Sequence, residues 1–173
     1  ILDIGSYSVQ GLAHMAQRGA HQVLAFSDSP TVLKKAIGSE EPALEFLHEQ
    51  DPPFSCETDF FEAVICLDLH SRLSNSEEPQ EWISEIRRIL KPEGILIVCS
   101  SQSTYQQLHH EIQPHFISVT LLGQFPLEGQ LFRDFGSNEE EPGLVLNRAL
   151  LASDENPQNL VMVFGPHCLE MDD

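Results

Sequence analysis

The sequence predicts an α/β domain in which helices cover both faces of a mostly parallel, doubly wound sheet. Short apolar runs alternate with segments that carry apolar residues at helical spacing. The chain opens with an apolar strand that runs into Gly5 and then into a helix. The last two strands, 115–124 and 160–164, follow each other without a clear helix between them, which predicts an antiparallel pair at the end of the sheet.

Each element has its own local signal. The helix expected over 9–18 is followed by Gly19, which suits the left-handed conformation after a helix. The helix over 79–90 has the clearest apolar face, on which Trp82 lies. Residues 68–76 are expected to form a polar loop, and residues 91–94 a turn with proline at its second position. The expected strands are residues 1–4, 23–26, 43–47, 63–67, 95–99, 115–124 and 160–164, and two further helices span 30–37 and 103–112.

Length and composition predict one globular domain over residues 1–173. The chain begins inside an expected strand, which indicates either a domain excised from a longer polypeptide or an unusually abrupt N-terminus. Residues 126–157, between the last two strands, are rich in Gly, Pro, Asn and acidic residues and are expected to form a loop-rich insertion. No apolar run is long enough to cross a bilayer, so we expect no membrane association.

The charge is strongly negative, with 27 acidic and nine basic residues and a formal net charge of −18. Such a surface repels nucleic acid and anionic membranes, which leaves a basic protein as the partner class that the charge permits. A solvated acidic surface is the simpler interpretation. The four cysteines show no CxxC spacing, so we expect neither a metal site nor disulfides, and a reducing, cytoplasmic setting.

Three stretches resemble, in order, motifs of the class I S-adenosylmethionine-dependent methyltransferases. Residues 2–5, Leu-Asp-Ile-Gly, are similar to the start of the family's cofactor loop, and residues 61–67, Phe-Glu-Ala-Val-Ile-Cys-Leu, to its acidic fourth-strand motif. Residues 86–97, which contain Lys-Pro-Glu-Gly, are closely similar to its helix, turn and fifth strand. The resemblance implies a Rossmann-like seven-stranded sheet of order 3-2-1-4-5-7-6 with an antiparallel last strand.

The resemblance also implies where S-adenosylmethionine would bind. The family's adenine-contacting acid is matched by Glu49 or Asp51. Asp68 and His70 follow the fourth strand, where the family places substrate or catalytic groups, and a histidine there can act as a general base. A solvated loop pair is the simpler interpretation of both residues. The full set of cofactor-binding candidates is Asp3, Gly5, Ser6, Tyr7, Ser27, Asp28, Asp51 and Leu67.

The cofactor loop departs from the family pattern. The second and third glycines of the family fall on Tyr7 and Val9, whose side chains would occupy space that the ligand needs. The ribose-binding acid falls on Ser27, and Asp28, one residue later in an extended segment, points to the opposite side. If each contact is worth about 1–3 kcal/mol, losing all three lowers affinity by about a hundredfold or more.

Two functional hypotheses follow. The favoured one is a pseudoenzyme: a methyltransferase-like domain with a degenerate S-adenosylmethionine site that serves as a structural or protein-interaction module. The alternative is a divergent, active methyltransferase in which the loop from Gly5 to Tyr7 and Asp28 hold the cofactor and Asp68 or His70 orients the acceptor. Its acceptor would be a small molecule or a glycan intermediate, because residues 119–124 resemble the sixth strand of bacterial methyltransferases tied to glycan synthesis.

Overall fold

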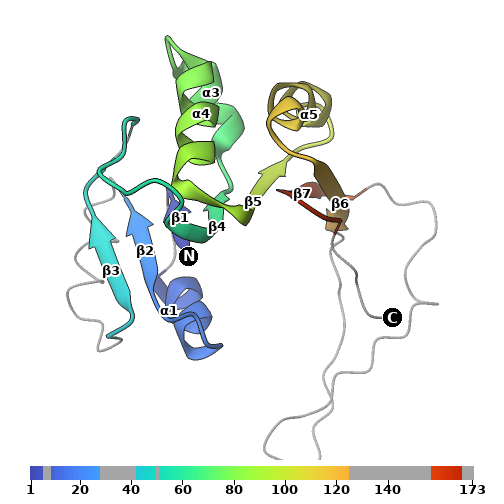
Figure 1. Ribbon diagram of the computed structural model, residues 1–173. Helices are drawn as coiled ribbons and strands as arrows, with labels where there is room; N and C mark the ends of the chain where they lie inside the picture. Colours follow the sequence, from blue (N-terminus) through green and yellow to red (C-terminus); the bar gives the residue numbers. More distant parts are fainter. Residues whose placement is uncertain (6–8, 28–41, 50, 125–156, 169–173) are drawn as a thin grey trace, which may run out of the picture.

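The computed structural model contains one seven-stranded sheet of order β3-β2-β1-β4-β5-β7-β6 (Figure 1). It describes residues 1–5, 9–27, 42–49, 51–124 and 157–168. β1 to β5 pair in parallel, whereas β7 is antiparallel to both β5 and β6. The predicted fold class and strand order are therefore confirmed.

The strands and helices alternate through the first part of the chain. The strands are β1 (Leu2–Ile4), β2 (Val23–Phe26), β3 (Leu44–Leu47), β4 (Phe61–Cys66), β5 (Leu90–Ser100), β6 (Ser118–Gln124) and β7 (Asn159–Gly165). The helices are α1 (Val9–Gln17), α3 (Leu69–Asn75), α4 (Pro79–Ile89) and α5 (Tyr105–Ile112), followed by the short 3₁₀ helix η1 (Gln113–His115). Gly19 has a φ of +105°, as predicted for the residue after α1.

The two faces of the sheet are covered differently. α3, α4 and α5 lie on one side of the sheet, and α1 lies on the other (Figure 1). The first side holds the main core, in which Trp82 of α4 and Leu108 of α5 pack with Leu96 and Val98 of β5. On the other side, Leu12 of α1 packs with β2, and Leu44 and Phe46 of β3 border this smaller cluster. Strand side chains alternate between the two faces, so β2 contributes Leu24 and Phe26 to the main core and Val23 and Ala25 to the smaller cluster.

Two sequence-based assignments are wrong. The polar loop expected over 68–76 is instead helix α3. Leu69 and Leu73 lie one turn apart on this helix, and both are buried in the main core. The strand expected over 115–124 begins only at Ser118, because the proline-containing helix η1 precedes it. The helix expected over 30–37 lies outside the described residues, as does the insertion expected over 126–157 apart from Pro157.

The prediction of a turn at residues 91–94 is also wrong. These residues lie within β5, where they form a large bulge. Leu90 pairs with Phe61 and Ile95 pairs with Ala63, so four residues of β5 lie opposite the single residue Glu62 of β4. Gly94 is buried in this bulge. A Cβ atom there would lie 2.8 Å from the Leu90 Cδ2 atom and 3.1 Å from the Phe61 carbonyl oxygen. The bulge therefore requires a glycine for lack of space.

No helix in the described part of the chain is both long and apolar enough to span a membrane.

We predict that Gly94→Ala destabilises the protein by about 1–3 kcal/mol, because the added methyl group meets the backbone of β4 as well as a side chain. Urea unfolding followed by Trp82 fluorescence measures the change. Glu93→Ala is the matched control, since Glu93 lies in the same bulge with 79% of its side chain exposed, and it should change stability by less than about 0.5 kcal/mol. Equal effects of the two substitutions would contradict the packing argument.

Candidate functional site

Gly5 forms the turn that follows β1. The side chains of Asp68, which precedes α3, and Arg72, within α3, lie close to this turn. Gly5 has a φ of +82°, and its N–H donates to the Phe26 carbonyl oxygen at 2.9 Å, which ties the turn to β2. A Cβ atom on Gly5 would lie 2.6 Å from Nη2 of Arg72 and 2.9 Å from Oδ1 of Asp68. Both the backbone conformation and the space therefore require glycine.

Asp68 and Arg72 form an ion pair that is in contact with Trp82 and Cys66. Asp68 precedes α3, and Arg72 lies one turn later, with Nε donating to Asp68 Oδ1 at 2.9 Å. The guanidinium lies over the Trp82 ring, with Cζ 5.2 Å from the ring centre, a distance that allows a cation–π interaction. The Cys66 thiol lies 3.6 Å from Asp68 Oδ1. Burial raises the pKa of Cys66 well above its ordinary value, so this thiol remains a protonated donor.

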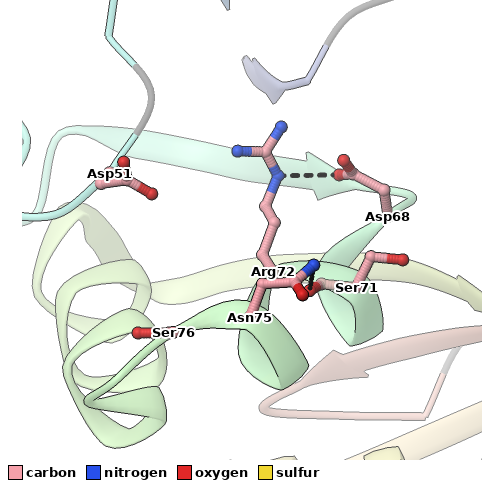
Figure 2. Close-up of a pocket in the computed structure, with 6 residues that line it drawn as sticks. All are labelled: Asp51, Asp68, Ser71, Arg72, Asn75 and Ser76. Atoms are coloured by element: carbon pink, nitrogen blue, oxygen red, sulfur yellow. Dashed lines mark hydrogen bonds and ion pairs between the residues drawn. The ribbon is translucent and has the colours of Figure 1, made fainter.

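This ion pair forms one wall of a pocket with a volume of about 210 Å³. Figure 2 shows the Arg72 guanidinium between the Asp51 and Asp68 carboxylates. The rest of the lining is polar and comes from α3 and the residue that follows it, and within α3 the Asn75 amide donates to the Ser71 carbonyl oxygen at 2.8 Å. The six lining residues are Asp51, Asp68, Ser71, Arg72, Asn75 and Ser76.

The structure brings some of the residues expected at the site together and separates others. Asp51 and Asp68 share the pocket, and Asp68 reaches Gly5. His70 is half-buried on α3 but does not line the pocket, and Leu67 has 53% of its surface exposed at the end of β4. Ser6, Tyr7 and Asp28 lie outside the described residues.

Asp3 and Ser27 have different surroundings from the pocket residues. Asp3 pairs with Ala25 of β2, whose side chain is in the cluster under α1, so Asp3 belongs to the α1 face of the sheet. Ser27 directly follows β2 and is buried, and its N–H donates to the Leu47 carbonyl oxygen at 3.3 Å. A buried serine at the end of β2 supplies a hydroxyl where the resemblance implies a carboxylate.

The four cysteines are all free, and no group of three or more metal-ligating side chains occurs in the ranges that the structure describes.

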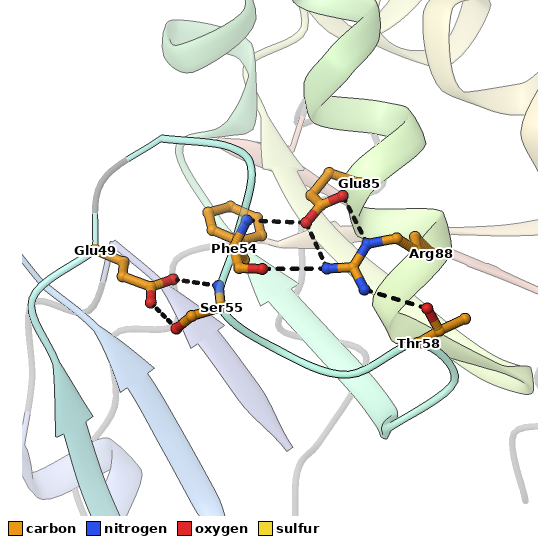
Figure 3. Close-up of polar contacts among 6 residues, drawn as sticks. All are labelled: Glu49, Phe54, Ser55, Thr58, Glu85 and Arg88. Atoms are coloured by element: carbon orange, nitrogen blue, oxygen red, sulfur yellow. Dashed lines mark hydrogen bonds and ion pairs between the residues drawn. The ribbon is translucent and has the colours of Figure 1, made fainter.

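A segment between β3 and β4, residues 49–58, is held against α4 by a network around Arg88 (Figure 3). Arg88 donates through Nε to Glu85 at 2.8 Å, through Nη2 to the Phe54 carbonyl oxygen at 3.2 Å, and through Nη1 to Thr58 Oγ1 at 3.2 Å. Glu85 also accepts the Phe54 N–H at 2.9 Å. Nearer the start of the segment, the Ser55 hydroxyl and N–H both donate to Glu49. We call residues 49–58, all of which except residue 50 are described, the strap.

The strap inserts the Phe54 ring into the main core. The ring centre lies 5.0 Å from that of Phe26 and 5.6 Å from that of Trp82. Phe26 immediately precedes Ser27, and Trp82 carries the Arg72 guanidinium, so one buried ring supports both sides of the site. The strap also carries Asp51 to the pocket.

Two ionisable groups of the strap network have shifted pKa values. Hydrogen bonds from Arg88 lower the pKa of Glu85 despite partial desolvation, so this carboxylate remains charged at neutral pH. Burial, with a smaller contribution from Glu49, raises the pKa of Cys56 to about 11, which keeps this thiol protonated and unreactive.

A family model described as "Methyltransferase domain" matches residues 2–98, more than half of the chain. The chain belongs to this methyltransferase family. The matched region runs from β1 to β5 and includes Gly5, the strap, the pocket and α4.

The relatives of this methyltransferase domain agree with that assignment. A demethylmenaquinone methyltransferase of Clavibacter sepedonicus is 30% identical over 100 residues, which are 57% of this chain and only 40% of that protein. A solved methyltransferase from Archaeoglobus fulgidus, described as SAM-dependent, superposes with a TM-score of 0.63 at 12% identity, covering 95% of this chain and 84% of its own. A solved complex with the Haloferax volcanii Trm112 methyltransferase activator also matches, with a TM-score of 0.57 at 16% identity, covering 98% and 83%. At these identities the solved structures establish the fold alone.

The sequence analysis of this methyltransferase domain missed Arg72, which is central to the pocket. The reason is the mistaken loop over 68–76, since a residue in a loop has no defined direction. Leu69 and Leu73, four residues apart, were the available signal for a helix, and a helix from Leu69 places Asp68 and Arg72 one turn apart on one side.

We predict that Arg88→Met lowers the stability of the methyltransferase domain by about 1–3 kcal/mol at pH 7, because it leaves the Phe54 carbonyl and Glu85 without their charged donor. The pKa of Glu85 is below its ordinary value of 4.5 in the folded state, so its stabilising effect is complete above pH 4.5 and is lost as the pH falls through the folded pKa. The difference between the wild type and the variant should therefore shrink below that pH. Urea titrations from pH 7 to pH 3 measure it.

Lys91→Met is the control for this experiment. It removes a 2.8 Å ion pair with Glu62 in which both side chains are largely exposed, 43% and 79%. Solvent screens such a pair, so its removal should change stability much less than Arg88→Met does. A pH-independent effect of Arg88→Met would contradict the role assigned to Glu85.

Proposed function

We propose that this methyltransferase domain is a pseudoenzyme that has lost productive S-adenosylmethionine binding and acts as a structural or protein-interaction module. The observation that carries the proposal is the Asp68–Arg72 ion pair packed against Gly5. A glycine in a cofactor loop leaves room for the ligand to approach the backbone. Here the Arg72 and Asp68 side chains lie within 3 Å of the position that a Cβ atom on Gly5 would have.

The surroundings of the ion pair make it costly to displace. The guanidinium is held by Asp68 and lies over Trp82, and only 19% of the Arg72 side chain is exposed. A ligand that approached Gly5 from this side would need to break a partly buried ion pair and its cation–π contact. The residues Tyr7, Val9 and Ser27, at positions where the family has two glycines and an acid, support the same conclusion from the sequence.

Other properties fit a protein-interaction role. The formal charge of −18 favours a basic protein partner over nucleic acid. One solved relative is a complex with the Trm112 methyltransferase activator, so a protein partner is known for at least one chain of this fold. We further propose a reducing, cytoplasmic setting, as expected from the cysteine spacing, and a single domain over residues 1–173, because the described strands form one sheet.

An active S-adenosylmethionine-dependent methyltransferase is the second candidate. Membership of the methyltransferase family and the 30% identity to a demethylmenaquinone methyltransferase favour it. In that case Gly5, Ser27 and Asp51 would contact the cofactor, and Asp68 would orient a small-molecule or glycan acceptor. The cofactor would supply the methyl group, and the protein would contribute mainly by aligning the two reactants.

Calorimetric titration with S-adenosylmethionine separates the two candidates. We predict no binding heat at millimolar ligand for the wild-type protein. A variant that combines Tyr7→Gly, Val9→Gly and Ser27→Asp should gain measurable binding, and adding Arg72→Ala should increase affinity by about tenfold or more, as expected for removal of one competing interaction of about 1–3 kcal/mol. Micromolar binding by the wild type would overturn the proposal.

Arg87→Ala, added to the triple variant in place of Arg72→Ala, is the matched control. Arg87 is an arginine of α4 that donates to the Leu90 carbonyl oxygen and does not line the pocket. It should leave ligand affinity unchanged. Circular dichroism of each variant checks that the fold is retained.

A further inference from the structure

Within the described part of the chain, the hydrogen bonds that tie the strap to other segments all go to α4. Glu85 accepts the Phe54 N–H, and Arg88 donates to the Phe54 carbonyl oxygen and to Thr58 (Figure 3). The remaining hydrogen bonds of the strap, near its start, are internal to it. A segment with one short set of anchors can open as a unit while the rest of the domain stays folded.

Phe54 is the one fully buried residue among the described residues of the strap. Its ring contacts Phe26 and also packs against Trp82, with an angle of 75° between the two ring planes. Trp82 is the only tryptophan of the chain, and it is buried in the same core. Withdrawal of Phe54 would leave a cavity beside Trp82, and a buried side chain beside a cavity relaxes into the space.

Trp82 connects the strap to the Gly5 turn through Arg72. The Arg72 guanidinium lies over the Trp82 ring, and its Nη2 atom lies 2.6 Å from the position that a Cβ atom on Gly5 would have. The ion pair with Asp68 is partly exposed at both side chains, so solvent weakens it. The Trp82 ring therefore contributes to holding the guanidinium beside Gly5.

We propose that the strap is a latch that sets the position of Arg72 beside Gly5. In the closed state Phe54 packs on Trp82, and the Trp82 ring faces the guanidinium. When the strap withdraws from α4, Trp82 relaxes into the volume that Phe54 leaves, and its ring no longer faces the guanidinium. The pocket changes in the same step, because the strap contributes Asp51 to the lining. Opening of the strap thus restores the room beside Gly5 that the closed strap denies to a ligand.

This inference rests on the proposed function, because it assigns regulation to the ion pair that blocks the Gly5 turn. Its experiments follow the Arg72 side chain without S-adenosylmethionine, whereas the calorimetric titration measures ligand binding. Arg72 can therefore be shown to move in a protein that binds the ligand, or to stay fixed in a protein that does not. Either result can fail while the other stands.

The first experiment labels arginine side chains of the full chain with phenylglyoxal and locates the label by mass spectrometry. Arg72 reports the state of the latch. Arg18, which directly follows α1 and is exposed, is the internal reference. In the wild type we expect Arg72 to react more slowly than Arg18, because only 19% of the Arg72 side chain is exposed.

Phe54→Leu removes the ring from the strap and keeps an apolar side chain. We expect it to speed Arg72 labelling by about three- to thirtyfold, the range that corresponds to the loss of one cation–π contact. Phe164→Leu is the matched control, because Phe164 is fully buried in the same core and its ring lies beside His109 of α5. It should leave Arg72 labelling unchanged. Equal acceleration by the two substitutions would mean that the core loosens as a whole, and would overturn the proposal.

Trp82→Leu tests whether Phe54 acts on Arg72 through the Trp82 ring. By itself it should speed Arg72 labelling over the same range as Phe54→Leu does. Adding Phe54→Leu to Trp82→Leu should then have no further effect, because both substitutions remove the same contact. Additive effects of the two substitutions, or unchanged labelling in Trp82→Leu, would contradict the proposed order of contacts.

A second experiment uses the wild type and does not depend on whether the variants fold. Hydrogen exchange of the Phe54 amide and phenylglyoxal labelling of Arg72 are followed at urea concentrations below the unfolding transition, with the amide of the buried Leu96 in β5 as the marker of global unfolding. We expect Phe54 exchange and Arg72 labelling to rise together, before Leu96 exchanges. The latch does not exist if Arg72 labelling stays constant while the Phe54 amide exchanges, or if that amide exchanges only together with Leu96.

Discussion

The parallel pairing of β1 with β2 on one side and β4 on the other is the constraint on which the site depends. Ile4 pairs with Phe26, and Asp3 pairs with Ile65, so all three strands end at the same edge of the sheet. Gly5 and Ser27 directly follow β1 and β2, and Asp68 is the second residue after β4. Residues more than 20 positions apart in the sequence therefore meet because parallel strands bring their carboxyl ends together.

Buried aromatic packing connects this edge to the rest of the domain. Arg88 and Glu85 on α4 hold the strap, the strap inserts Phe54 between Phe26 and Trp82, and Trp82 supports the Arg72 guanidinium. A continuous series of contacts thus runs from Arg88 and Glu85 on α4 to the partly buried Asp68–Arg72 ion pair. Such support explains how a charged pair can remain packed against the Gly5 turn instead of extending into solvent.

The two faces of the sheet have different consequences for function. The face under α3, α4 and α5 holds a closed core and leads to the pocket, so changes there affect stability and ligand access together. The other side of β4 and β5 carries apolar residues that are only half-buried, such as Ile65 and Ile97, which pair with each other. The two sides of the same strands therefore have different surroundings, because side chains alternate along a strand.

The sequence by itself determined the order and type of most described elements, because apolar periodicity reports which side chains are buried on a strand or helix. It also identified Gly5 and Asp68 as site candidates through their positions after strands, and Asp51 through the family resemblance. It failed at α3, which is too short for its two leucines to outweigh its polar residues, and at the bulge of β5, where a Lys-Pro-Glu-Gly signal typical of a turn lies inside a strand. Only the tertiary structure decided which side chains lie beside Gly5 and which helices pack on each side of the sheet. Both depend on contacts between distant segments, and local sequence preferences carry no information about such contacts.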